Sequence, residues 1–326
     1  MITRRRIVLA LGAGAFAPFA TFAQQRKVWR IGFLWIRNPS DFLPFSDAFK
    51  AGMSALGYAE GRDYVIEFRA AQGDLARLPA LAAELVALKV DVIVSSGTPT
   101  VVAASKATRE IPILLTTAGD PVGNGLVASL ARPGGNITGL TSLTTELFTK
   151  RLDLLRQILP KMRRVGILYD ANDPNDALSL KRIESDCGKL QIQPVRAPVR
   201  KAEEFAAAFN TLTSHKAQAL LVTNTAITSV SIASVIDHAA KHRLPTSHGS
   251  SNWVEAGGLF AYAADFPDLY RRVAAYADKI FKGAKPGDLP IEQPTRFEFV
   301  LNMKTAKALG LKIPGSILVQ VTKVIE

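Results

Sequence analysis

The stretch RIGFLW at residues 30–35 returns in altered form as RVGILY at residues 164–169. Each is a short apolar run of the length of a buried strand, and each precedes a turn with Asn and Pro and then a helical pattern. Strands and helices alternate in this way along the chain, which is typical of a parallel sheet covered by helices on both faces. The repeat predicts two such sheets rather than one.

Later strands of the two halves correspond as well. VIV at 92–94, which runs into SSGT, matches ALLV at 219–222, which runs into TNT. IPI at 111–113 matches LPT at 244–246. We therefore predict an α/β fold of two similar doubly wound parallel-sheet lobes joined by a hinge.

The lobe boundaries are predicted from the segments outside this repeat. RPGGNITG at 132–139 separates the halves and is rich in residues that break helices. A helix at about 268–282 and the stretch from 297 onward remain after the second half, and we expect them to cross back and complete both lobes. The expected lobes are residues 28–140 plus about 262–290, and about 141–261 plus 291–326, with hinges near 138–141 and 260–266.

The first residues have the features of an export signal. A basic start, MITRRR at 1–6, precedes an apolar run of about 16 residues that ends at Thr21-Phe22-Ala23. The run is shorter than the roughly 20 residues of a membrane-spanning helix, so we expect a signal peptide over 1–23, cleaved after about Ala23. The general secretory and twin-arginine routes both fit. No Cys follows the run, which predicts a periplasmic protein without a lipid anchor.

Composition sets limits on the class of protein. The chain has 326 residues, 48% of them hydrophobic, enough for two domains with large cores. The net charge of +12 is dispersed along the sequence, and export argues against a nucleic-acid partner. A single cysteine, Cys187, cannot form an internal disulfide. We expect a monomer.

Ligands of open parallel sheets bind at the carboxyl ends of the strands, so two facing lobes predict a cleft there. The loops at these ends are rich in small and polar residues, whose hydroxyls and amides form directional hydrogen bonds. The predicted ligand-binding residues are Trp35, Ser40, Ser96, Gly97, Thr98, Thr117, Asp120, Tyr169, Asp170, Asn172, Thr223, Asn224, Thr225, Gly249 and Ser251.

Helix starts in these loops suggest an anion site. Thr98 before Pro99 and Asp173 before Pro174 have the pattern of an N-cap with proline in the first turn. The positive end of either helix would suit a ligand carboxylate.

Other side chains of the loops have two interpretations each. Asp120 and Asp170 could receive a ligand ammonium, or could bond their own turns. Trp35 and Tyr169 end equivalent strands and could hold a flat apolar ligand between them, or could lie buried under helices.

From Trp29 to Glu326 the chain resembles the ABC-transporter substrate-binding family that includes tryptophan- and tyrosine-type transport proteins. The phrases that carry the resemblance are LGY with EGR (56–62), LP with AAELV (78–86), VDVIV (90–94), GDPVG through GLVASLARPGGN (119–136), HRLP (242–245), VEAGG (254–258) and KTAKALGL (304–311). The resemblance implies a type I periplasmic-binding-protein fold that closes on a small solute, such as an aromatic amino acid, and delivers it to an ABC permease and ATPase. It also implies ligand contact for Ser96, Thr98, Asp120 and residues 223–225.

Other functional classes find little support. The sequence has no Gly-x-Ser-x-Gly elbow, Walker loop, His-Glu-x-x-His or dinucleotide fingerprint, so we expect no enzyme, catalytic residue or cofactor. His238 and His242 have the spacing of a metal pair, but histidines also favour a helix end, and no metal is expected. A periplasmic sensor for a membrane signalling partner and, less so, an enzyme on the same fold stay open as alternatives.

Overall fold

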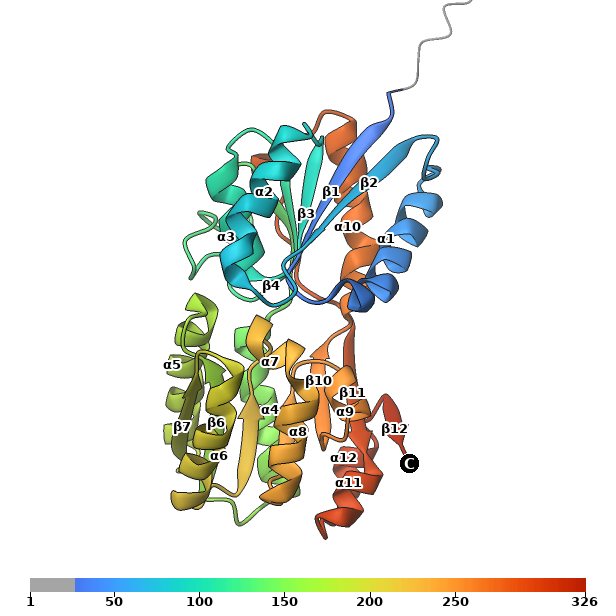
Figure 1. Ribbon diagram of the computed structural model, residues 1–326. Coiled ribbons are helices and arrows are strands. Elements are labelled where there is room, and N and C mark those ends of the chain that lie inside the picture. Colours follow the sequence, from blue (N-terminus) through green and yellow to red (C-terminus); the bar gives the residue numbers. More distant parts are fainter. Residues whose placement is uncertain (1–26) are drawn as a thin grey trace, which may run out of the picture.

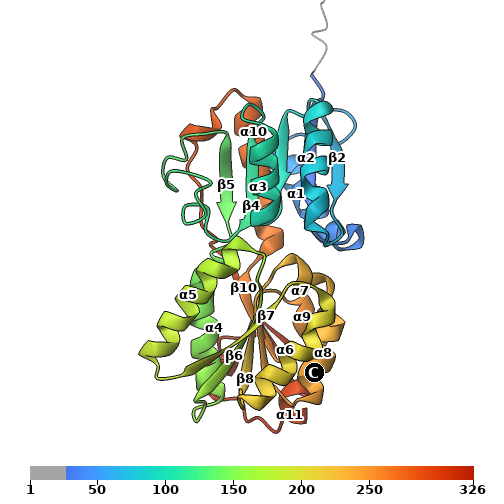
Figure 2. The same ribbon diagram turned by 60° about the vertical axis from the view of Figure 1, so that its left-hand side comes forward.

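The computed structural model describes residues 27–326, without the side chains of Thr145 and Pro174. The predicted signal peptide at 1–23 lies outside the described residues. Two lobes stand one above the other, each a sheet between layers of helices, as the views in Figures 1 and 2 show. This confirms the predicted α/β class with two parallel-sheet lobes.

The first lobe contains a five-stranded, entirely parallel sheet in the order β2-β1-β3-β4-β5. Helix α10 comes late in the chain but packs on this sheet, against α1 (Figure 1). The elements are β1 Trp29–Trp35, α1 Leu43–Ala55, β2 Tyr64–Ala70, α2 Leu78–Ala87, β3 Val92–Ser95, α3 Thr98–Ala107, β4 Ile113–Ala118, β5 Ile137–Thr141 and α10 Phe266–Phe281, with the 3-10 helices η1 Pro39–Phe42, η2 Leu75–Arg77 and η4 Pro286–Asp288.

The second lobe repeats the strand order as β7-β6-β8-β9-β10 and then adds β11 and β12. The added β11 runs antiparallel to β10, an exception that the sequence did not suggest. The elements are α4 Thr144–Ile158, β6 Arg164–Asp170, α5 Pro174–Lys189, β7 Gln193–Val199, η3 Ala202–Glu204, α6 Phe205–Ser214, β8 Ala219–Val222, α7 Ala226–Val230, α8 Ile232–Lys241, β9 Thr246–His248, α9 Asn252–Glu255, β10 Phe260–Ala264, β11 Phe297–Asn302, α11 Met303–Ala308, α12 Gly315–Leu318 and β12 Lys323–Ile325.

The glycine shared by the two repeated stretches has a packing role. A Cβ built at Gly32 in β1 would lie 3.1 Å from Leu85 of α2. A Cβ at the equivalent Gly166 in β6 would overlap Leu212 of α6. Both central strands therefore need glycine where a helix packs closely on the sheet.

Three crossings join the lobes. The first follows β5 at Ser142 and Leu143, and Leu143 has a left-handed backbone with φ of 52°. The second is at Asp265, because β10 continues to Ala264, so the boundary expected near 262 falls inside a strand of the second sheet. The third precedes β11, and Glu292 still bonds Gly139 of the first lobe.

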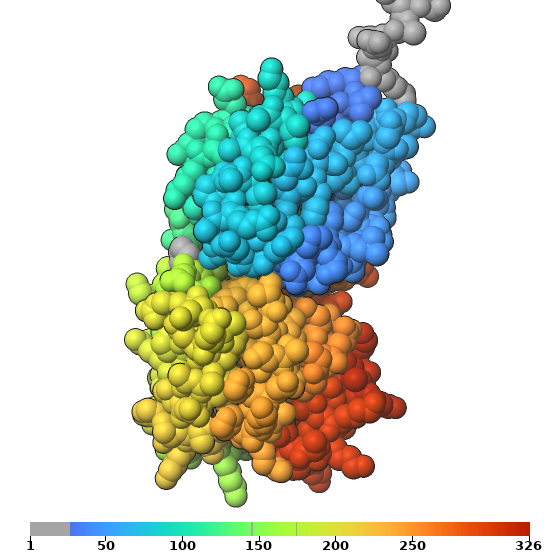
Figure 3. All heavy atoms as spheres, in the orientation of Figure 1, coloured from blue at the N-terminus to red at the C-terminus, as the bar shows by residue number. Residues whose placement is uncertain are grey.

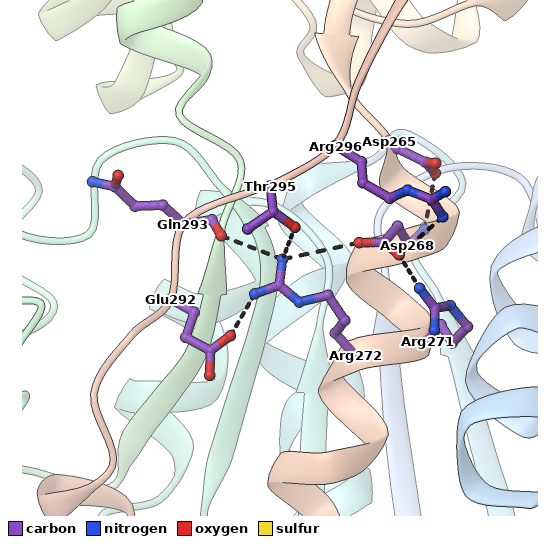
Figure 4. A network of polar contacts seen from close by, with 8 residues as sticks. All are labelled: Asp265, Asp268, Arg271, Arg272, Glu292, Gln293, Thr295 and Arg296. Atoms are coloured by element: carbon purple, nitrogen blue, oxygen red, sulfur yellow. Dashed lines mark hydrogen bonds and ion pairs between the residues drawn. The ribbon is translucent and has the colours of Figure 1, made fainter. Parts of the chain in front are cut away.

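Arginines tie the second and third crossings together (Figure 4). Arg272 of α10 donates to the Gln293 carbonyl and the Thr295 hydroxyl, both at 3.3 Å, and pairs with Glu292. Asp268, which is 4% exposed, pairs with Arg271 one turn away on the same helix. The base of α10 and the strand that returns to the second lobe thus form one connected hinge region.

Among the described residues, no helix is both long and apolar enough to cross a membrane.

Candidate functional site

A pocket lies between the lobes at the carboxyl ends of the strands, with about 700 Å³ of empty space, part of it open to solvent. In the space-filling view the lobes meet along a seam across the waist of the molecule (Figure 3). The pocket is lined by Trp35, Ile36, Arg37, Phe45, Ser96, Gly97, Thr98, Pro99, Thr117, Gly119, Phe266 and Tyr270 of the first lobe, and by Thr144, Asp173, Asn175, Asn224, Thr225, Ala226 and Ser229 of the second.

The first lobe contributes an aromatic wall. Trp35 ends β1, and its ring centroid lies 5.2 Å from that of Phe45 on α1 and 6.2 Å from that of Tyr270 on α10. The Trp35 indole N–H donates to the Asn38 carbonyl at 3.0 Å, which fixes the orientation of the ring. Phe266 at the start of α10 completes the wall. Two segments distant in the sequence, β1 with α1 and the late helix α10, thus form an apolar surface suited to a flat ring.

Helix starts contribute the polar side of the pocket. The prediction for α5 is confirmed, since the Asp173 carboxylate accepts from the Asn175 N–H at 2.8 Å. The prediction for α3 is wrong in detail, because Gly97 is the N-cap and Thr98 is already the first helical residue. Gly97 has φ of 87°, a left-handed conformation that favours glycine and turns the chain sharply into the helix.

Three buried aspartates lie at the start of α5. Burial raises the pKa of Asp173 to about 6 and also raises the pKa values of Asp170 and Asp176. Beneath them is Arg151 of α4, 1% exposed, whose pKa burial lowers to about 9 while the charge of Asp176 opposes that shift. Its guanidinium carbon lies 4.1 Å from the centre of the Phe148 ring. The second lobe therefore buries three carboxyl groups and a guanidinium near the start of α5, and burial disfavours the charged form of each of them.

We expect Asp173→Asn to stabilise the unliganded protein at alkaline pH. Because the folded pKa of about 6 lies above the ordinary 3.8, the stability linked to Asp173 is full below 3.8 and is lost as pH rises through about 6. Asn caps a helix as well as Asp but carries no charge. The free energy of unfolding should rise by about 1–3 kcal/mol at pH 8 and by little below pH 4, measured by urea denaturation.

The matched control for this variant is Asp74→Asn. Asp74 is exposed and accepts from the Ala76 N–H at 3.0 Å at the start of a short 3-10 helix, so the same kind of cap is altered at a site that is not buried. We expect no comparable gain there at pH 8. An equal gain in both variants would show that burial of Asp173 is not its cause.

The structure brings together seven of the fifteen predicted ligand-binding residues. They lie at the carboxyl ends of four strands from both lobes, and all of them line the pocket: Trp35, Ser96, Gly97, Thr98, Thr117, Asn224 and Thr225. Their contact with a solute stays a prediction.

The other eight predicted residues lie outside the pocket lining. Several of them form hydrogen bonds or pack within their own lobe instead. Asp120 accepts from the Gly123 N–H at 2.7 Å, and Asp170 accepts from the Asn172 N–H at 2.8 Å, so both carboxylates bond their own turns. Thr223 is buried and donates to Asp176 at 2.7 Å. Tyr169 packs against the core of the second lobe and is not among the lining residues, which agrees with the second of its two interpretations, a buried position.

The remaining residues of this set occupy other surroundings. Ser40 and Asn172 are exposed. Gly249 covers Arg151, since a Cβ built there would lie 3.3 Å from Nη1 of that guanidinium. Ser251 lines a separate shallow hollow beside β11 and β12.

Sequence reasoning missed several lining residues, above all Arg37, Phe45, Asn175, Phe266 and Tyr270. Arg37 had a signal, because it is a lone charge directly after a buried strand. Phe266 and Tyr270 lie in the segment at about 262–290 that is predicted to return to the first lobe, but nothing in the sequence indicates that they reach the cleft.

The two lobes also touch each other across the cleft. A Cβ built at Gly119 of the first lobe would lie 2.5 Å from Oδ1 of Asn175 at the start of α5. Asn124 donates to the same oxygen at 3.4 Å. A Cβ at Gly73 would lie 3.0 Å from Val230 of α7. These contacts at two places define a closed arrangement of the lobes.

A match to the family described as ABC transporter substrate binding protein spans residues 38–325. The chain belongs to this family. It is therefore the substrate-binding protein of an ABC transporter, whose partners are a small-molecule solute and a membrane transporter. It is 29% identical over 258 residues to a tyrosine-binding protein of Clostridioides difficile strain R20291, with 78% of this chain and 73% of that protein covered.

Solved structures of related proteins have the same fold. A conserved domain protein of Vibrio cholerae O1 biovar El Tor N16961 superposes with a TM-score of 0.85 at 26% identity, covering 91% of this chain and all of the other. The ABC domain of Streptococcus pneumoniae in complex with L-Trp gives 0.85 at 25% identity, covering 92% and 100%.

A third relative differs in its conformation. The ligand-free, open structure of a substrate-binding protein from Clostridium difficile gives a TM-score of only 0.68, at the same 25% identity and with 91% and 99% covered. Identity and coverage are nearly equal to those of the L-Trp complex, so the lower TM-score reflects a difference in shape rather than in relatedness. The likeness to the L-Trp complex agrees with the cross-cleft contacts of a closed form.

Proposed function

We propose that this substrate-binding protein takes up an aromatic amino acid or a related aromatic carboxylate in the pocket between its lobes. The observation that carries the proposal is the wall of Trp35, Phe45, Phe266 and Tyr270, which faces helix starts and small polar side chains across the pocket. An aromatic ring would pack on the wall, and the polar end of the solute would bond the opposite side. The names of the tyrosine-binding relative and the L-Trp complex support the same class of solute.

The proposed contacts come from both lobes, which suits a clamp. The solute would bind one lobe first and then hold the closed form by bridging to the other, because a ligand shifts such an equilibrium only through its greater affinity for one state. We further propose that the chain is exported, works as a periplasmic monomer without a lipid anchor, and delivers its solute to an ABC permease and ATPase.

A thermal-shift screen tests the proposal. Purified protein is unfolded and refolded to remove carried-over solute, then heated with tryptophan, tyrosine, phenylalanine, aromatic acids, nucleosides, sugars or short peptides. Binding to the native state alone adds about 2.7 kcal/mol at a hundredfold excess over the dissociation constant, so a true solute should raise the melting temperature by several degrees. We expect shifts with the aromatic amino acids or acids. A shift confined to sugars or nucleosides would reject the proposed solute class.

A further inference from the structure

Arg37 is a largely buried cation on the aromatic side of the pocket. It follows β1 by two residues, and its side chain is 13% exposed. Its guanidinium carbon lies 5.0 Å from the ring centre of Trp35 and 5.4 Å from that of Phe45. These two rings hold the guanidinium beside the surface on which the solute would pack.

Within the protein this charge is poorly compensated. The nearest carboxylate is that of Asp41, with Oδ2 3.9 Å from Nε, beyond hydrogen-bond distance. No hydrogen bond joins the guanidinium to any residue in the part of the chain that the structure describes. Burial lowers the pKa of Arg37, and the charges of Asp41 and Tyr270 only oppose that shift. A guanidinium nevertheless keeps its charge at neutral pH.

The rest of the lining does not supply a counter-charge. Among the lining residues, Asp173 is the only one with a carboxylate, and that group caps α5 on the opposite lobe. The five N–H donors of the planar fork have no hydrogen-bond partner in the described part of the protein and keep some accessible surface at the pocket, so they are free to meet an acceptor on a ligand. A carboxylate fits such a fork with two parallel hydrogen bonds.

We propose that Arg37 is the specificity-determining residue that requires an anionic group on the solute, and that the solute carboxylate lies against its guanidinium beside Trp35 and Phe45. This inference rests on the proposed function. It assigns carboxylate recognition to a side chain of the first lobe rather than to the helix starts of α3 and α5.

Acids and their amides of the same shape provide the test. Titration calorimetry on refolded protein would compare L-tryptophan with L-tryptophanamide, indole-3-acetate with indole-3-acetamide, and 4-hydroxyphenylacetate with its amide. The wild type should prefer each acid that binds by at least tenfold. In Arg37→Gln the affinity for the acid should fall by about tenfold to a hundredfold, and that for the amide by less than about threefold.

Two further variants separate charge from geometry and from folding. Arg37→Lys keeps the charge but loses the planar fork, and its acid preference should be intermediate. Arg109→Gln removes the same charge from an exposed turn and should behave as the wild type. All variants should melt within a few degrees of the wild type. If Arg37→Gln failed to fold, the comparison of Arg37→Lys with the wild type would decide.

The outcomes distinguish this inference from the proposed function. Binding of acids with an unchanged acid-to-amide ratio in Arg37→Gln would reject the role of Arg37 and leave the aromatic solute class standing. Equal binding of acids and amides by the wild type would reject the anion requirement itself. If none of the six compounds bound the wild type, both the solute class and the role of Arg37 would be rejected.

Discussion

Gly119→Ala should weaken solute binding by about tenfold to a hundredfold while leaving the free protein folded. The added methyl would lie 2.5 Å from the Asn175 amide, but only when the lobes are closed. Overpacking of this kind costs about 1–3 kcal/mol, which the closed form alone would bear. Gly119 has no left-handed backbone, so alanine is not strained there. Calorimetry would measure the affinity, and scattering would show whether tryptophan still compacts the protein.

A second substitution shows whether Asn175 is the cause. In an Asn175→Ala background the added effect of Gly119→Ala should shrink to less than about threefold, because the overlapping amide is gone. Gly135→Ala, where a Cβ would meet nothing within 4 Å, is the control and should bind as the wild type does. A tenfold loss that persists in the Asn175→Ala background would mean that the methyl meets the solute itself rather than the opposite lobe.

Gly52→Ala should destabilise the protein by about 2–3 kcal/mol. Gly52 lies in α1 where α10 crosses it, and a Cβ there would overlap the backbone carbonyl of Arg271 and lie 2.8 Å from Cβ of Ala274. Alanine favours helix by up to about 1 kcal/mol, but the overlap with backbone outweighs that gain because the helices must separate. Urea denaturation would measure the loss.

The matched control is Gly188→Ala in α5. There a Cβ would meet nothing within 4 Å, so the helix propensity acts alone and should stabilise the protein by up to about 1 kcal/mol. Opposite signs for the two variants are therefore expected. A neutral Gly52→Ala would mean that α1 and α10 are less closely packed than the structure has them.

The fold class could be predicted from the sequence because local apolar patterns repeat in the same order in both halves. RIGFLW and RVGILY mark β1 and β6, and the strands that follow them in sequence take equivalent places in the two sheets. Each strand or helix shows its own apolar pattern because one face or all of it is buried. These patterns can therefore be recognised in the sequence without knowing which segments pack together. The antiparallel β11 left no such mark, since it has no equivalent in the first half.

The same reasoning predicted seven of the nineteen residues that line the pocket. Ser96, Thr98 and Asn224 follow directly from the rule that loops at the carboxyl ends of parallel strands meet a ligand. The rule predicts which loops lie at the cleft, but it does not predict the direction in which each side chain points. Asp120 and Asp170 therefore lie on the expected loops while their carboxylates bond neighbouring N–H groups instead.

By itself the sequence determined the two α/β lobes and the loops that face the cleft, because each depends on contacts between residues near one another in the chain or on a repeated pattern. Only the tertiary structure decided that the returning α10 brings Phe266 and Tyr270 to the cleft, that Arg37 lies beside two aromatic rings without a hydrogen bond, and that Gly119 meets Asn175 across the cleft. The first and third of these features depend on how segments more than fifty residues apart pack together, and the second depends on the direction of one loop side chain. Neither leaves a periodic signal in the chain.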